Sequence, residues 1–265
     1  DKPDFTWSTN LTISANKNKV ISIGDGQEFI TLDNPNGSSG PSIRIIPGYP
    51  APAYLGATYL GTYRTTAEID ADGVVGSVLG GPRYVDLDGN GAINQLDFIV
   101  HGDPNPDFYG GLRNTLTYKD FTLDFFFHGS YGNEILNAAY HLGYFGRDPR
   151  SNLLPIVKDR WTTSNQNSDI PRAGSSFGNY QQRSDVSYQD GSFLRLKNVT
   201  LTYDLDIPGM KRASVYVTGN NLLLFTKFTH GDPEQSNYGD GLAQGVANGG
   251  YPYNSSFALG FNLTL

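Results

Sequence analysis

The sequence contains no cysteine and only one methionine among its 265 residues. The lack of cysteine excludes disulfide bonds, thiolate catalysis and thiolate metal sites together. No run of about 18 apolar residues is present, which excludes a transmembrane helix. A membrane location stays open, because the strands of a transmembrane barrel are only about 10 residues long and alternate in polarity.

The charge balance excludes a further class of partner. The net charge is −7 and no basic run with interleaved aromatic residues is present, so the sequence argues against nucleic acid as a partner.

No nucleophile elbow, P-loop or dinucleotide fingerprint occurs, and the histidines show neither HxH nor HExxH spacing. We therefore expect no enzyme activity. The chain starts at Asp1 without an initiator methionine or a signal peptide, as a fragment would.

The abundant residues favour β-structure with many loops over helices, since there are 32 glycines and 17 tyrosines. Apolar and mostly polar residues alternate along 121–131, and successive side chains of a strand point to opposite faces. One face carries Phe121, Leu123, Phe125, Phe127 and Tyr131, and the other carries Thr122, Asp124, His128 and Ser130. A soluble sandwich would turn the apolar face inward, whereas a transmembrane barrel would turn it outward to lipid.

Strands of this kind are expected at 5–20, 110–118, 121–131, 193–205, 213–228 and 256–265. The connections at 119–120 and 206–212 are short. Those at 24–108, 132–188 and 229–254 are long and rich in Gly, Pro, Asn and Ser. If the strands alternate in direction, all short turns fall on one rim and all long loops on the other, as in outer-membrane barrels. The expected fold is all-β: an antiparallel transmembrane β-barrel segment of about six strands, too few to close around a wide lumen.

Within the long loops the local signals are weaker. Residues 43–64 are expected to form a strand pair, and 151–161 a short helix with Ser151 or Asn152 as its N-cap. The out-of-phase run 222–225 is consistent with a bulge. Loop aromatic residues either stack on sugar rings or pack within their own loops; they are Tyr54, Tyr59, Tyr140, Tyr144, Phe145, Tyr238, Tyr251 and Tyr253.

One motif predicts a metal site. Residues 86–97 read DLDGNGAINQLD, the spacing by which a 12-residue loop wraps a calcium ion. The expected ligands are Asp86, Asp88, Asn90, the Ala92 carbonyl and Asp97. Position 12 is aspartate, as in dockerin-type loops, where an EF-hand has glutamate. The alternative is an Asx-rich turn that needs no metal.

Candidate ligand-binding residues lie on the polar face of the predicted strands. Asp124, His128 and Asn198 would face the lumen of a barrel, where side chains tune selectivity. The simpler alternative, which we favour, is that these side chains merely face water.

Several motifs carry a family resemblance that covers nearly the whole chain. The run YVDLDGNGAINQLDFIVHGDPNPDFYGGLRNTLTYKDFTLDFFFHGSYG resembles the C-terminal region of SusC/RagA-type TonB-dependent outer-membrane transporters. KDRWTTSNQNSDIPR at 158–172, DGSFLRLKNVTLTYDL at 190–205 and VTGNNLLLFTKFTHGDPE at 217–234 also match, in the family's order. The closing SSFALGFNLTL resembles the family's terminal strand, although Leu265 stands where an aromatic residue is common.

The resemblance implies a full protein about four times longer, with a barrel of about 22 strands. A signal peptide, a TonB box and a plug would belong to it and are absent from this chain, which would form the C-terminal barrel portion throughout 1–265. A SusD-like surface lipoprotein would deliver oligosaccharide or oligopeptide, and TonB would act through the plug. The remaining barrel and outer-membrane lipid would be the other partners, with the long loops outside the cell.

Two other functions compete with nutrient import. One is a secreted carbohydrate-binding β-protein with a calcium loop; it leaves the alternation of 256–265 unexplained. The other is an outer-membrane anchor barrel that displays loops for adhesion.

Overall fold

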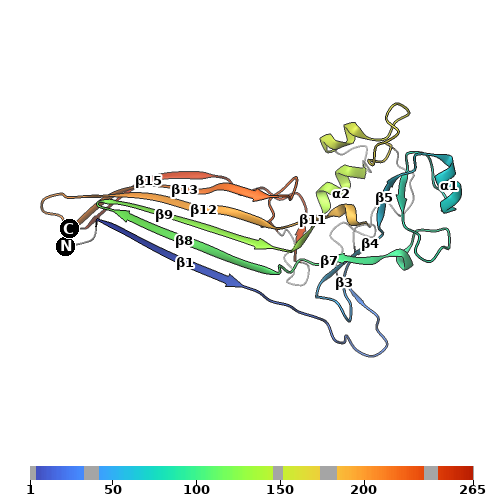
Figure 1. Ribbon diagram of the computed structural model, residues 1–265, viewed down its shortest axis with the longest axis horizontal. Helices are drawn as coiled ribbons and strands as arrows, with labels where there is room; N and C mark the ends of the chain where they lie inside the picture. The colour runs from blue at the N-terminus through green and yellow to red at the C-terminus, as the bar shows by residue number, and fades with distance from the viewer. Residues whose placement is uncertain (1–3, 33–41, 146–151, 174–183, 236–243, 265) are drawn as a thin grey trace.

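The computed structural model describes residues 4–32, 42–145, 152–173, 184–235 and 244–264. A long six-stranded antiparallel sheet forms one part, and a group of small sheets and helices lies at one end of it (Figure 1). Along the long sheet the order is β1 (Phe5–Ser14), β8 (Phe108–Tyr118), β9 (Phe121–Tyr131), β12 (Phe193–Leu205), β13 (Arg212–Thr226) and β15 (Ser256–Thr264). The predicted strands and the all-β class are confirmed. The first strand ends at Ser14 rather than at residue 20, because the alternation stops at the polar sequence after it.

The register separates the two faces of this sheet along their whole width. One row of paired residues crosses from Leu123 to Leu201, Val217 and Leu259, and these side chains are apolar. Leu201 is 47% exposed and Leu259 is 75% exposed. Large apolar side chains left exposed over a whole sheet face indicate that something apolar covers that face. We call it the outer face.

The opposite face, which we call the inner face, carries polar rows. Asp124 pairs with Thr115 on one side and with Thr200 on the other, and Thr200 pairs with Thr218. The alternation predicted for 121–131 is thus continued by the neighbouring strands, since cross-strand partners share a face.

Both short turns lie at the same end of the long sheet, together with the chain termini (Figure 1). Lys119 adopts a φ of 52° in the β8–β9 turn, and Gly209 has a φ of 89° in the β12–β13 turn. The long connections all lie at the other end, as the strand parity predicts.

A bulge accounts for the run that is out of phase. The register of β12 shifts between Leu196 and Asn198, and Asn221 of β13 has a φ of 52°. The extra residue in β13 returns Leu223 and Phe225 to the outer face, as expected of a bulge. The interpretation of 222–225 as a bulge is confirmed.

The long connection 24–108 is folded rather than irregular. It contains β2 (Ile30–Thr31), β3 (Ser42–Ile45), β4 (Ala53–Gly56), β5 (Tyr59–Thr62), α1 (Thr66–Asp72), β6 (Pro82–Tyr84), the 3₁₀ turn η1 (Gln95–Asp97) and β7 (Ile99–Gly102). The four strands β2-β3-β4-β7 form one sheet, and β5 pairs with β6. The strand pair predicted within 43–64 is β3–β4.

The other two long connections also hold regular elements. Residues 132–188 include β10 (Glu134–Asn137), α2 (Ala138–Phe145) and the 3₁₀ turns η2 (Pro155–Asp159) and η4 (Asp185–Ser187). β11 (Tyr188–Asp190) and β14 (Val246–Ala247) flank β10 in a three-stranded sheet. The helix predicted at 151–161 is only η2, because Pro155 permits a turn from Leu154 onward. Asn152 does not cap it, and Ser151 lies outside the described residues.

A shared core joins the three long connections. Ile43, Tyr54, Leu136 and Val246 form one buried cluster, and at most 1% of any of them is exposed. The Tyr54 ring stacks on Tyr188 with centroids 5.0 Å apart. These connections therefore fold together as one unit, which we call the loop domain. Among the described residues, none of the helices is long and apolar enough to cross a bilayer.

Candidate functional site

Side chains on the inner face form a network of hydrogen bonds between neighbouring strands, which we call the polar lattice. The Asn198 amide donates to Thr218 Oγ1 at 3.0 Å and to Asn220 Oδ1 at 2.9 Å, and the hydroxyls of Thr200 and Thr218 lie 2.8 Å apart. Asn220 in turn donates to Ser256 Oγ at 3.2 Å. The lattice spans β12, β13 and β15, so Asn198 has a role in holding the wall.

Asp124 is also held by neighbouring strands. Arg113 Nε donates to Asp124 Oδ2 at 2.9 Å, and Thr115 Oγ1 donates to the same oxygen at 2.7 Å. The Arg113 side chain is 64% exposed, so its charge faces water beside a largely covered carboxylate. Surface pairs of this kind contribute roughly 0–1 kcal/mol.

His128 leads to a cluster that the sequence did not reveal. Its Nε2 lies 3.1 Å from Glu234 Oε1, and Arg195 Nε lies 2.5 Å from Glu234 Oε2. Arg195 Nη2 lies 2.5 Å from Asp232 Oδ1, and both side chains of this pair are at most 3% exposed. The cluster joins β9 and β12 to the segment after β13. A signal was present: a buried arginine favours a carboxylate partner, and GDPE at 231–234 supplies two.

The electrostatics of this cluster favour a charged Glu234. Burial by itself would raise the pKa of Glu234, but His128 and the positive charges of Arg195 and Lys197 outweigh burial and lower it. Asp232 also accepts a hydrogen bond from the backbone N–H of Tyr253 at 3.3 Å. This bond connects the loop that precedes β15 to the cluster.

A hollow of about 340 Å³ lies on the inner face beside this cluster. Its lining includes Phe126, His128, Phe193 and Glu234. The structure thus places His128 at a concave surface with aromatic walls and a carboxylate. Asp124 and Asn198 do not line it.

Most of the loop aromatic residues pack within the loop domain. Tyr144 and Phe145 are buried with Ile170, and Tyr59 and Tyr140 pack against them. Tyr54 lies in the core, while Tyr251 is 93% exposed and Tyr253 is 49% exposed. Tyr238 lies outside the described residues. Of the two interpretations, packing within the loops fits the described members of this set other than Tyr251 and Tyr253.

The 86–97 loop brings three of its predicted ligands together. Carboxylate oxygens of Asp86, Asp88 and Asp97 lie within 4.8 Å of one another. Backbone amides hold these groups in place: Gly89 and Gly91 donate to Asp86, each at 2.8 Å. The Gly91 amide is the leading cause of a lowered pKa for Asp86, which favours its charged form.

Asp97 is the buried member of the group, with 0% exposure. It accepts the Leu87 amide at 2.8 Å and the Asn94 amide at 2.7 Å. The other two predicted ligands face their own loop: Asn90 Oδ1 accepts the Ala92 amide at 2.8 Å, and the Ala92 carbonyl accepts from the Asn94 side chain at 3.0 Å.

The residues present fit a calcium ion. Ca²⁺ takes six to eight oxygen ligands from carboxylates and carbonyls. Within the described part of the chain, the three converging carboxylates have no ion pair with lysine or arginine. No basic side chain among the described residues therefore offsets their mutual repulsion, and a divalent cation would relieve it.

Comparisons with known proteins agree on one kind of relative, the TonB-dependent receptors. No family model matches the chain. It is 39% identical over 271 residues to the TonB-dependent receptor P26 of Formosa agariphila, a match that covers 98% of the chain and 27% of the receptor. The TonB-dependent receptor SusC of Bacteroides thetaiotaomicron is 23% identical, with 98% of the chain and 24% of SusC covered.

Solved structures show the same fold. The RagAB peptide transporter matches with a TM-score of 0.77 at 21% identity, covering 99% of this chain and 27% of that one. A "closed-closed" state of the RagAB peptide importer matches with a TM-score of 0.76 at 22% identity, covering 100% of this chain and 28% of that one. The chain thus spans about a quarter of the length of its relatives. It belongs to the SusC/RagA-type TonB-dependent receptors, and its long sheet is a segment of their barrel wall.

Proposed function

We propose that the chain forms part of the wall and the loop domain of a TonB-dependent importer in the outer membrane, and that it is not an enzyme. The observation that carries the proposal is the two-faced long sheet. Its outer face leaves Phe257, Leu259 and Phe261 each at least 74% exposed, while its inner face carries a hydrogen-bonded polar lattice. A bilayer on one side and a hydrated lumen on the other match both faces.

The difference in loop length between the two ends of the long sheet gives its orientation in the membrane. The end with the short turns faces the periplasm, and the loop domain faces outward, since outer-membrane barrels have short periplasmic turns and longer extracellular loops. The loop domain then lies where a SusD-like lipoprotein delivers substrate. TonB acts through the plug of the intact protein.

The substrate class is an oligosaccharide or an oligopeptide. Support for a peptide comes from the RagAB structures, which are named as a peptide transporter, and the hollow beside His128 and Glu234 offers polar and aromatic contacts for either class. Asp124, His128 and Asn198 are the wall residues that face it or the lumen around it. The secreted carbohydrate-binding alternative does not account for the exposed apolar face. An adhesin barrel does not account for the likeness to TonB-dependent receptors.

Membrane fractionation of the intact protein tests the proposal. We expect the protein in the outer-membrane fraction as a band whose migration changes on heating. A deletion strain should lose uptake of the substrate, and mild detergent should co-purify a surface lipoprotein. Recovery as a soluble monomer would show the barrel interpretation to be wrong.

We also propose that the 86–97 loop binds Ca²⁺, with Asp86, Asp88, Asn90, the Ala92 carbonyl and Asp97 as ligands. The ion would stiffen the loop domain rather than take part in chemistry. Support comes from the 12-residue spacing and the three converging carboxylates.

Terbium luminescence and hydrogen exchange on the intact protein test this site. Asp88 is exposed, so Asp88→Asn removes a ligand charge without disturbing the core. We expect Ca²⁺ to slow exchange in 86–97 in the parent and in the control Asp206→Asn, which lies on the other rim. Asp88→Asn should lose this effect, and unchanged exchange in the parent would contradict calcium binding.

A further inference from the structure

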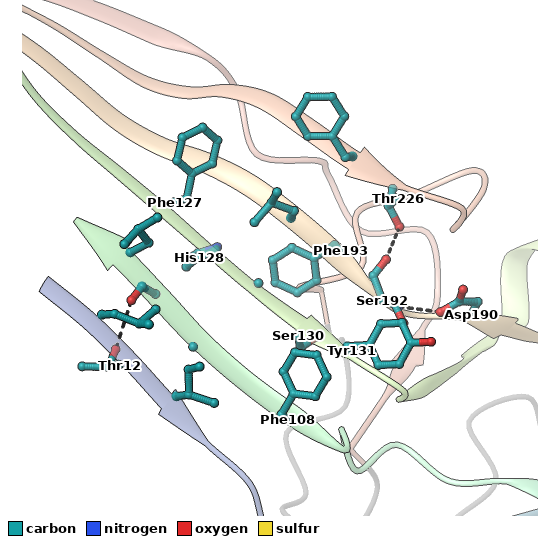
Figure 2. A pocket seen from close by; sticks show the side chains of 18 of the residues that line it. Thr12, Phe108, Phe127, His128, Ser130, Tyr131, Asp190, Ser192, Phe193 and Thr226 are labelled. Carbon is teal, nitrogen blue, oxygen red and sulfur yellow. Dashed lines mark hydrogen bonds between the residues drawn. The ribbon is translucent and has the colours of Figure 1, made fainter. Parts of the chain in front are cut away.

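A groove of about 870 Å³ is cut into the outer face at its loop-domain end (Figure 2). Gly110 and Gly129 form its floor, and Leu112, Phe127, Leu194 and Phe225 are among the apolar residues around it. Its volume lies in the range of roughly 300–1,000 Å³ that small-molecule sites occupy.

The groove arises from two glycines on neighbouring strands. Gly110 of β8 pairs directly with Gly129 of β9, so two adjacent positions of one outer row carry no side chain. A Cβ at Gly129 would collide with the carbonyl oxygen of Phe193, which explains why a larger residue does not fill the gap. The flanking rows are bulky: Phe108 stacks on Tyr131 with centroids 5.3 Å apart, on one side of the gap.

The groove changes from apolar to polar toward the loop domain. Lys227 and Asp190 line that end, with Ser192 and Thr226 beside them. The Lys227 ammonium lies 3.9 Å from Asp190, and the lysine side chain is 86% exposed. An exposed pair at this distance is weak, so the ammonium is available to another anion. Lysine side chains at membrane edges extend in this way toward the headgroup region.

We propose that the groove binds one acyl chain of an anionic, phosphate-bearing lipid of the outer leaflet, with a lipid phosphate beside Lys227. The inference rests on the proposed function, because it requires the outer face to meet lipid. Two features select this occupant. The groove is continuous with the exposed apolar rows of the wall, and the Lys227 ammonium stands at the end where a bilayer places its phosphates. A bound chain would fill the gap that the glycines leave.

The test uses the intact transporter in nanodiscs whose anionic probe lipid is phosphatidylglycerol with a photoreactive group on its acyl chain. Crosslinked peptides are mapped by mass spectrometry. We expect peptides with Leu112, Phe127 or Phe225 to be labelled several-fold more than the β15 peptide with Leu259. Even labelling of all outer rows would overturn the proposal, as would protection of the groove by a co-purifying protein.

Two pairs of variants separate the apolar and charged ends. Leu194→Trp should fill the groove and lower its labelling several-fold, whereas Leu259→Trp, on the same face outside the groove, should not. Lys227→Glu should lower labelling, whereas Lys211→Glu at the opposite rim should not. Equal labelling within either pair would overturn the part of the proposal that the pair tests.

Failure of the lipid site and failure of the proposed function give different results. Each variant is first checked for outer-membrane location and for migration that changes on heating. A parent protein that lacks both contradicts the importer itself. A parent that shows both but labels evenly contradicts only the lipid site.

Discussion

Phe125 and Phe126 are adjacent residues with the same side chain and opposite surroundings. Phe125 pairs with Val199 on the outer face, whereas Phe126 pairs with Asn198 on the inner face. The strand period of two gives each residue its face, so neighbouring positions allow the bilayer and the lumen to be probed separately.

Phe125→Lys should impair assembly, because a lysine on the lipid face costs about 2–4 kcal/mol at the bilayer midplane. Phe126→Lys is the matched control, since its ammonium would meet the hydrated inner face. The fraction of protein with heat-modifiable migration measures both. Equal assembly of the two variants would show that the faces are assigned wrongly.

Glu134 is expected to make the stability of the loop domain depend on pH. Burial, and then the negative charges of Asp103 and Asp190, raise its pKa from 4.5 to about 7. The folded state thus holds the proton more tightly than the unfolded chain. Its contribution to stability is complete below about pH 4.5 and is lost as the pH rises through about 7.

We expect the opening free energy of β10 to fall by on the order of 1–2 kcal/mol between pH 5 and pH 8, after allowance for partial exposure. Hydrogen exchange of the β10 amides measures it. Glu134→Gln should remove this pH dependence. A fall of the same size in that variant would exclude Glu134 as its origin.

At the scale of elements, buried charge fixes the segment after β13 to the wall. Arg195 of β12 contacts both Asp232 and Glu234, and Asp232 also accepts the amides of Glu234 at 3.1 Å and Tyr253 at 3.3 Å. Removal of one partner from a buried ion pair leaves an uncompensated charge, which costs far more than loss of a surface pair.

Arg195→Met should lower the opening free energy of 231–235 by about 3–5 kcal/mol. Arg113→Met, which removes the exposed partner of Asp124, should cost no more than about 1 kcal/mol. Hydrogen exchange at the Glu234 and Tyr253 amides distinguishes the effects of the two variants. Comparable protection in both variants would mean that the buried cluster does not hold this segment.

At the scale of the whole molecule, the loop domain depends on contacts between segments far apart in the sequence. Leu136 of β10 is fully buried against Ile43 of β3, Tyr54 of β4 and Val246 of β14. The loop domain should therefore open as one unit.

Leu136→Ala should cost about 2–5 kcal/mol and raise hydrogen exchange in β3, β4 and β14 together. Leu60→Ala, at a position that is 51% exposed, should leave these strands protected. Faster exchange confined to β10 in Leu136→Ala would contradict a shared core.

The long sheet could be predicted from local pattern, because the alternation of period two marks each strand and its faces without knowledge of its neighbours. The sequence alone therefore determined the positions of β8, β9, β12, β13 and β15, the side on which the turns lie and the spacing of the 86–97 loop. It did not place the end of β1 or the elements of the loop domain, whose short strands lack a sustained period.

Only the tertiary structure decided which distant residues meet. Arg195 finds Asp232, three connections share a core around Leu136, and Gly110 meets Gly129 to open a groove on the outer face. These contacts depend on the register between strands and on loop closure, which no local period encodes. The alternating pattern thus predicts the wall, and the contacts between its strands and loops create the sites on it.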